Sequence, residues 1–448
     1  MKRLIPGIFV TVFLSAAGTW AWFWDGTPPE VIYPGPAAVR PEQKVCITVR
    51  DAGRGLRSVK VTGLLEDRTR TVAETHYGLK GWPWSRAATE AEVCAEIAAL
   101  EPDEGPLELH VVAEDQPNLW LLSRRTETAI PLVVDRTPPR IELLSREHRV
   151  RQGGAEFVAF RVSEEGVSGV LVGERSFRSF AIAGSGSGVR GCLFALAHDA
   201  PLDTPLALWA EDAAGNRRVQ PLACERLPGR FRRRNIEVSD AFIRQVVPAI
   251  LEDSGEEGLA GEGLEAFLAV NRRLRERNNT QITELTRGVT AERRWTGPFR
   301  QLTNSQVESL FADYRSYYYG GKKVDEQVHL GFDLASLAHS PVEAADRGKV
   351  IFADYLGIYG NTVILDHGWG LYSLYAHLSR VDVEPGQTVE AGEALGWTGR
   401  TGLAGGDHLH FSMLVQGVQV NPLEWWDPRW VENHVEARIR KLGDPVSR

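Results

Sequence analysis

Three short segments carry side chains suited to metal binding and proton transfer. The segment GGDHLHFSML holds His408 and His410, two residues apart. Upstream, HLGFD holds His329 and Asp333, and YAHLS holds His377. Histidine is otherwise scarce: the chain of 448 residues has 11. Imidazole and carboxylate groups bind divalent metals and move protons, so these segments are candidates for metal-dependent chemistry.

Strand geometry gives the two spacings a meaning. Side chains at positions i, i+2 and i+4 of a strand share one face. An extended HLGFD segment would put His329 and Asp333 on one side, with Gly331 leaving that face unobstructed. His408 and His410 would likewise share a face. Two such strands side by side would bring two to four metal-binding groups together.

This set of side chains matches the needs of a zinc hydrolase. Catalytic zinc takes three protein ligands and keeps one position for water. The ion lowers the pKa of that water and polarises a carbonyl group, which suits amide hydrolysis. Two further histidines beside the open position would transfer protons. Each segment alone is more often structural, and the spacing does not decide which histidine of HLH is the ligand. We expect His367 to be structural and His339 to lie on the surface.

The segments that position these residues are short strands between glycine-rich turns. Examples are GKVIFADY, GNTVILDHG and GLYSLYAHL, and helical patterning is almost absent. Such strands indicate a compact, mostly antiparallel β domain. We place this domain at residues 296–430 and a C-terminal tail at 431–448.

A weak internal repeat occupies the first half of the chain. DGTPPEVIY begins at Asp25, and DRTPPRIEL begins at Asp135. Each copy contains alternating runs such as KVCITVRD, which indicate half-buried strands and a β-sandwich. The EDAAGN segment resembles the turn before the last strand of bacterial immunoglobulin-like repeats. We therefore predict Ig-like sandwiches at 26–135 and 136–230, in a mainly β, multidomain chain.

A helical connecting segment is predicted at 231–295. In SDAFIRQVVPAILEDSG, Ser239 is a plausible N-cap, and Pro248 would either kink or end the helix. A second helix is expected over GLEAFLAVNRRLRERNN. Packing against a neighbouring domain is the favoured interpretation, and a lid over an active site is the alternative.

The N-terminus indicates export. Lys2 and Arg3 precede an uncharged stretch, Leu4 to Trp24, which is long enough to cross a bilayer as a helix. We favour an inner-membrane anchor over residues 1–25, and a cleaved signal peptide is the alternative. Either interpretation puts the bulk of the chain in the cell envelope or periplasm.

The cysteines agree with an exported protein, and the net charge bears on the choice of partner. Disulfides persist outside the cytoplasm, and one bond within each repeat would join Cys46 to Cys94 and Cys192 to Cys224. No CxxC spacing suggests a zinc site built from them. The net charge of −8 gives no reason to expect nucleic acid as a partner.

The stretch from 329 to 422 resembles the M23 (lysostaphin/LytM-type) zinc metallopeptidases. The shared pattern includes HLGFDLA, SPVEAADRGKV, YGNTVILDHGWGLYSLYAHLS, EPGQTVEAGEALGWTGRTG, HLHF and VNP, in this order. The resemblance implies a β-rich peptidase fold with a cleft over the sheet and one Zn²⁺ per chain. The implied zinc ligands are His329, Asp333 and His410, and the implied general base and transition-state stabiliser are His377 and His408.

The resemblance also implies a substrate. Members of this family mostly cut peptide cross-links of bacterial peptidoglycan, which suits an exported chain with spacer domains. The sandwich domains would be spacers, modules that bind envelope proteins, or a cover for the cleft, and the sequence does not choose among these. Asp407 departs from the proline common in the family. One alternative is a non-catalytic envelope protein that binds the wall or regulates another hydrolase. A metallopeptidase that acts on secreted proteins is another.

Overall fold

The computed structural model is mainly β, as the sequence predicts, and it divides the chain into two compact units. One unit runs to Pro139 and includes Glu211–Arg217, and the other comprises Arg140–Ala210 and Arg218–Arg448. The structure describes residues 27–65, 68–79, 87–117, 123–255 and 261–443.

The predicted membrane anchor lies outside the described residues. Within the ranges that are described, no helix has the length and apolar character needed to cross a bilayer.

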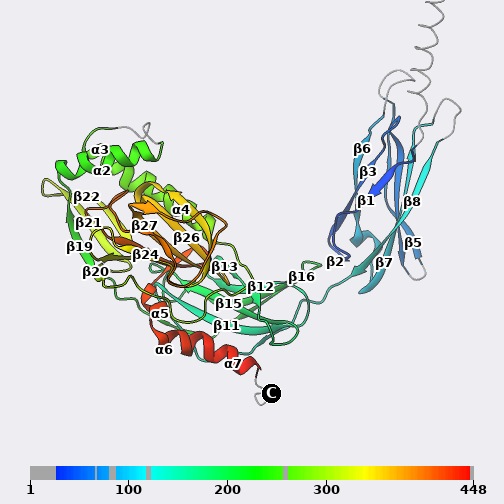
Figure 1. Cartoon of the computed structure of the whole chain (residues 1–448). Helices are drawn as coiled ribbons and strands as arrows, with labels where there is room; N and C mark the ends of the chain where they lie inside the picture. The colour runs from blue at the N-terminus through cyan, green and yellow to red at the C-terminus, as the bar shows by residue number, and fades with distance from the viewer. Residues whose placement is uncertain (1–26, 66–67, 80–86, 118–122, 256–260, 444–448) are drawn as a thin grey trace, which may run out of the picture. The chain divides into compact units, whose positions relative to one another are not determined.

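The first unit contains a β-sandwich (Figure 1). Its strands alternate buried and exposed residues, so that Val45 and Ile47 of one sheet share a core with Leu109 and Val111 of the other. One sheet has the order β1-β3-β6 and the other β2-β8-β7-β4-β5. The strands are β1 (Glu30–Ile32), β2 (Ala38–Val39), β3 (Lys44–Arg50), β4 (Leu56–Leu65), β5 (Arg68–His76), β6 (Glu90–Glu96), β7 (Gly105–Asp115) and β8 (Arg125–Val134), and a 3-10 helix, η1 (Ile97–Leu100), follows β6.

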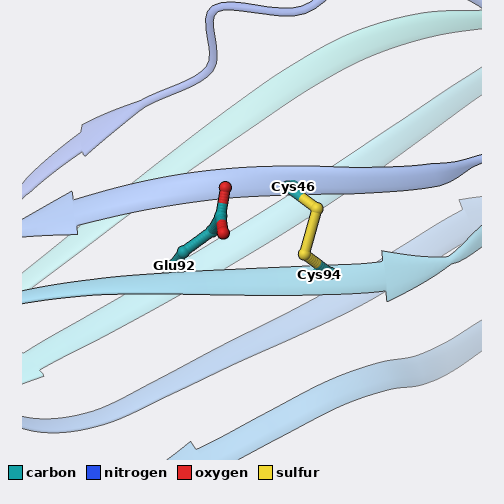
Figure 2. Close-up of side chains that lie close together, drawn as sticks. All are labelled: Cys46, Glu92 and Cys94. Atoms are coloured by element: carbon teal, nitrogen blue, oxygen red, sulfur yellow. A yellow bond between two sulfur atoms is a disulfide. The ribbon is translucent and has the colours of Figure 1, made fainter.

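One of the two predicted disulfides is confirmed. Cys46 and Cys94 lie directly opposite each other on β3 and β6 and form a disulfide (Figure 2). Glu92 lies beside them, but the two sulfur atoms are bonded to each other and are therefore not available as thiolate ligands.

The second predicted disulfide was wrong: Cys192 and Cys224 are free thiols. Cys192 is fully buried in β15, where its Sγ lies 3.5 Å from the carbonyl oxygens of Phe177 and Arg178. Cys224 lies on β18, in a different sheet, opposite His148 of β10. Burial raises the pKa of both thiols, that of Cys224 to about 12, so neither is a reactive thiolate.

The second unit begins with another pair of four-stranded sheets, ordered β14-β15-β11-β9 and β13-β12-β16-β17, and a parallel pair, β10-β18. Its strands are β9 (Ile141–Leu143), β10 (His148–Arg151), β11 (Gly154–Val162), β12 (Gly166–Val172), β13 (Arg175–Arg178), β14 (Phe180–Ala181), β15 (Val189–Leu196), β16 (Leu206–Asp212), β17 (Arg217–Pro221) and β18 (Cys224–Leu227).

An eight-stranded sheet forms the centre of the second unit. Its order is β20-β23-β31-β27-β26-β25-β29, and β32 also pairs with β31. Two three-stranded sheets, β19-β21-β22 and β24-β30-β28, complete this part. The strands are β19 (Arg233–Glu237), β20 (Gln306–Ser309), β21 (Asp313–Tyr319), β22 (Lys322–His329), β23 (Phe332–Ala335), β24 (Pro341–Glu343), β25 (Gly348–Tyr355), β26 (Asn361–Gly368), β27 (Leu371–Leu378), β28 (Arg380–Val381), β29 (Thr388–Val389), β30 (Ala394–Trp397), β31 (Leu409–Val415) and β32 (Val418–Val420).

The predicted helical segment forms and packs on this sheet. Helix α2 (Asp240–Asp253) begins after Ser239, whose hydroxyl accepts the Phe242 N–H at 3.2 Å, so the predicted N-cap is confirmed. Pro248 lies inside α2 and does not end it. The second predicted helix comprises α3 (Leu264–Ala269), a π-helical turn η3 (Val270–Leu274) and α4 (Arg275–Thr286).

The two faces of the central sheet bury different partners. In β31, Phe411 and Met413 join a core shared with the sandwich strands of this unit. Leu414 points the other way and joins a second core, formed with α2, α3 and α4. Because alternate residues share a face, His410 and Ser412 lie on the helix side with Leu414.

The C-terminal residues form helices against β11. Glu156 of β11 is fully buried and forms an ion pair with Arg438. His434 Nδ1 lies 2.9 Å from Glu156 Oε2. Glu424 also contacts this strand, since its Oε2 accepts the Ala155 N–H at 2.8 Å. The C-terminal helical elements are α5 (Pro422–Trp426), α6 (Pro428–Val431), the π-helical turn η5 (Glu432–Glu436) and α7 (Ala437–Gly443).

Candidate metal centre and catalytic site

The five side chains singled out in the sequence converge on one cavity. The cavity has a volume of about 230 Å³ and lies on the helix side of the central sheet. A larger cavity of about 1280 Å³ is lined by the sandwich strands of the same unit and α7, and it contains none of the five. The five that meet in the smaller cavity are His329, Asp333, His377, His408 and His410.

His329 and Asp333 come from two different strands. His329 is the last residue of β22, and Asp333 lies in β23, which belongs to another sheet. The expectation of one continuous extended segment was therefore wrong, because the chain turns at Leu330 and Gly331. Gly331 is required by close approach: a Cβ there would lie 2.6 Å from the imidazole of His410.

The expectation that two neighbouring strands would bring metal-binding side chains together agrees with the structure. Asp333 of β23 and His410 of β31 are directly opposite in register. Asp333 Oδ1 lies 2.9 Å from His329 Nε2 and 3.1 Å from His410 Nδ1, and the two nitrogen atoms are 2.9 Å apart. In a tetrahedral zinc site with bonds near 2.0 Å, ligand atoms are about 3.3 Å apart. The three atoms thus fit around one small cation.

Hydrogen bonds fix which nitrogen of each ligand-type histidine faces the cation position. His329 Nδ1 lies 3.1 Å from the carbonyl oxygen of Leu310, to which it donates. His410 Nε2 donates to Ser412 Oγ at 3.0 Å, because the Ser412 hydroxyl is itself committed to the Leu330 carbonyl. In the neutral tautomers that fit these hydrogen bonds, His329 Nε2 and His410 Nδ1 each carry a lone pair that can bind a metal ion.

His377 and His408 lie beside this group with their Nε2 atoms free of a backbone partner. His377 Nδ1 donates to the carbonyl of Thr401 at 2.8 Å, and His408 Nδ1 donates to that of Gly406 at 2.9 Å. The two imidazole centroids are 4.8 Å apart. This pair can accept and donate protons at the mouth of the group.

A β-bulge aims His377 at the site. The register between β26 and β27 shifts between Asn361 and Val363, and His377 has a φ of +62° within β27. A side chain in the left-handed region costs about 1–2 kcal/mol. Bulges of this kind recur next to active sites, where they redirect a side chain.

The charges of the site follow from burial and neighbours. Burial opposes the charged form of Asp333, but His329, His408 and His410 outweigh it and hold the pKa of Asp333 well below its ordinary value. Burial, together with the neighbouring histidines, lowers the pKa of His377, and burial also lowers the pKa of His410 to about 4. A carboxylate held beside imidazole nitrogens is a ligand set that zinc favours.

Three further polar residues singled out in the sequence lie outside the group of five. His367 is buried, with Nδ1 at 2.8 Å from the Arg347 carbonyl and Nε2 at 2.7 Å from Ser373 Oγ, in agreement with its predicted role. Asp407 contacts the loop of His339: its Oδ2 accepts the His339 N–H at 3.2 Å. Asp407 thus joins two loops at the rim of the site.

Three charged residues that were not predicted from the sequence also line the cavity: Glu237, Arg275 and Arg315. Arg315 of β21 donates from Nη2 to Asp333 Oδ2 at 2.9 Å. Its only signal in the sequence is an arginine among tyrosines, in DYRSYYY, which does not identify its partner. Phe242 of α2 and Phe267 of α3 line the cavity, so the predicted connecting segment forms one wall of the site.

Comparison with known proteins assigns this part of the chain to a family. Residues 327–422 match the sequence model of Peptidase family M23. All five histidine and aspartate positions of the cavity lie inside this match. Residues 327–422 are therefore an M23 peptidase domain.

Individual relatives carry peptidoglycan activities in their names. The chain is 39% identical over 97 residues to the DD-carboxypeptidase/endopeptidase Mpg of Neisseria meningitidis, covering 22% of each chain. It is 35% identical over 96 residues to the peptidoglycan DD-endopeptidase ShyA of Vibrio cholerae, covering 21% of this chain and 22% of the relative. The match thus spans about a fifth of the length of these relatives. A crystal structure of a zinc-containing peptidase from Vibrio cholerae aligns with a TM-score of 0.27 at 15% identity, over 78% of this chain and 84% of the other.

Proposed function

We propose that this protein is a zinc-dependent endopeptidase that hydrolyses the peptide cross-links of bacterial peptidoglycan. The observation that carries the proposal is the convergence of one carboxylate oxygen and two imidazole nitrogens, each within 3.1 Å of the others. Two histidines stand beside them, each with Nδ1 held by a backbone carbonyl. This is the minimum equipment for metal-assisted hydrolysis of an amide.

We assign one zinc ion per chain to three ligands, His329 Nε2, Asp333 Oδ1 and His410 Nδ1. Zinc would polarise the scissile carbonyl and lower the pKa of a water molecule next to it. His377 and His408 would supply the remaining chemistry, because each has Nδ1 tied to a carbonyl and presents Nε2 to the cavity. A neutral imidazole accepts the proton of the attacking water, and an imidazolium donates a hydrogen bond to the developing oxyanion.

The substrate class is supported by the relatives. Mpg is named as a DD-carboxypeptidase/endopeptidase, and ShyA is named as a peptidoglycan DD-endopeptidase. We infer that this chain works in the cell envelope. The uncharged stretch at residues 4–24 would anchor it to the inner membrane, and the sandwich domains would act as spacers or as sites for envelope proteins.

Paired histidine variants test the proposal. Full-length protein is loaded with zinc, its metal content is measured by elemental analysis, and it is then incubated with purified peptidoglycan. His408→Ala should retain zinc and lose turnover, whereas His410→Ala should lose zinc and turnover together. His339→Ala, at an exposed residue of the rim, is the matched control and should behave as wild type. Cleavage by His410→Ala at the wild-type rate would refute the assignment.

A further inference from the structure

Arg315 forms an ion pair with Asp333, one of the proposed zinc ligands. It lies on β21, which pairs with β19 on one side and β22 on the other (Figure 1). Arg315 lines the same cavity as the five site residues. The Arg315 and Asp333 side chains are 19% and 11% exposed, so the ion pair between them is largely shielded from solvent. Such a pair is screened by salt much less than a surface pair.

The two oxygens of Asp333 have different partners. Oδ1 lies within 3.1 Å of His329 Nε2 and His410 Nδ1 and 3.5 Å from His408 Nε2. Oδ2 instead accepts the Nη2–H of Arg315 at 2.9 Å. The carboxylate is therefore oriented with one oxygen toward the histidines and the other toward the guanidinium.

This orientation matters because a carboxylate can bind a metal through one oxygen or two. Binding through both would use a position that a catalytic site keeps open. Hydrogen bonds from surrounding residues decide such choices and commonly change metal affinity 10- to 100-fold. An arginine suits this role, since it stays charged and holds its donors in a rigid plane.

We propose that Arg315 is a positioning residue of the metal centre, which holds Asp333 Oδ2 and thereby restricts this carboxylate to ligation through Oδ1. The inference rests on the proposed function for its ligand set. It adds that the geometry of the centre depends on a residue of β21, outside the sequence segments that carry the ligands.

The neighbouring strand supplies a matched control. Arg234 of β19 lies directly opposite Arg315 in register and is exposed. Its Nη1 lies 3.4 Å from the Glu308 carbonyl oxygen and from Ser309 Oγ, and it makes no contact with Asp333. Arg234→Met removes the same charge from a neighbouring strand without touching the proposed ligands.

Zinc affinity and a spectroscopic probe test the inference in the full-length protein. Competition with a chelating indicator should give Arg315→Met a zinc dissociation constant about 10- to 100-fold above wild type, with Arg315→Lys in between and Arg234→Met unchanged. With Co²⁺ in place of zinc, visible absorption should weaken in Arg315→Met, because four-coordinate Co²⁺ absorbs more strongly than five-coordinate Co²⁺. An unfolding temperature of the metal-free variant equal to wild type confirms that the fold is intact.

His410→Ala, titrated in parallel, separates the two levels of the argument. If His410→Ala loses zinc while Arg315→Met keeps the wild-type affinity and spectrum, the inference about Arg315 is overturned and the proposed function stands. If His410→Ala binds zinc as wild type does, the ligand assignment itself fails. A higher KM in Arg315→Met without any change in zinc affinity or spectrum would also overturn the inference.

Discussion

Glu424 should make the second unit less stable as the pH rises. Its carboxyl is enclosed by β11, where it accepts the Ala155 N–H and lies against Gly154. Burial, together with the neighbouring Glu156, raises the pKa of Glu424 to about 8, against an ordinary value of 4.5, while Arg151 and the Ala155 N–H act in the opposite direction. The folded protein therefore holds a proton that the unfolded chain releases above pH 4.5.

The sign and size of the effect follow from linkage. Wherever the folded state binds more protons than the unfolded state, the free energy of unfolding falls as the pH rises. Each unit of pH costs about 1.4 kcal/mol while only the unfolded state is deprotonated. Between pH 5 and pH 8, just within the window set by the two pKa values, the loss amounts to about 3 kcal/mol.

Glu424→Gln isolates this contribution from other titrating groups. The glutamine keeps an oxygen for the Ala155 N–H but does not titrate. Equilibrium denaturation followed by tryptophan fluorescence should show wild type losing about 3 kcal/mol more than Glu424→Gln between pH 5 and pH 8. If the difference in unfolding free energy between the two proteins is the same at pH 5 and pH 8, the reasoning about burial at this site is refuted.

Three further predictions concern the C-terminal helices and the site. Arg438→Met removes the cation that pairs with the fully buried Glu156 and should lower the free energy of unfolding by about 3 kcal/mol. An unchanged unfolding temperature would contradict this. Gly331→Ala places a Cβ against His410 and should weaken zinc binding and turnover at least about 10-fold, whereas Gly297→Ala, which has open space, should not. Phe242→Ala thins the helical wall of the cavity, so phenanthroline should strip zinc several-fold faster than from wild type; equal rates would show that α2 does not limit access.

The sequence was most informative where residue type and strand periodicity act together. His410 was placed on the face opposite Phe411 by alternation alone, and the structure has Phe411 in the core and His410 in the cavity. The expectation that a neighbouring strand would add a carboxylate also holds, since Asp333 is the registered partner of His410. Both outcomes depend on the period of two in a strand, which is a local property.

Features that depend on long-range packing were not predictable in this way. Cys192 and Cys224 were paired because they share a repeat, but they lie in different sheets. Arg315 reaches Asp333 only because β21 and β23, which belong to different sheets, both border the cavity. His377 needs a bulge and a positive φ to face the site, and the residues of YAHLS predict neither the bulge nor the positive φ.

The role of the helical segment was open for a similar reason. The apolar spacing of α2 and α3 predicts a buried face but not the surface that buries it. In the structure that surface is the site-bearing face of the central sheet, so Phe267 is fully buried there and lines the cavity. Amphipathicity is a property of the helix, whereas its partner is a property of the fold.

The most direct test of the proposed function is the identification of its products. Purified peptidoglycan is digested with the zinc-loaded full-length protein and, in parallel, with His408→Ala, and the soluble fragments are analysed by mass spectrometry. Wild type should convert cross-linked fragments to uncross-linked ones by hydrolysis of peptide bonds, and His408→Ala with bound zinc should release none. Intact cross-links after incubation with the zinc-loaded wild type, or equal cleavage by both proteins, would contradict the proposed function.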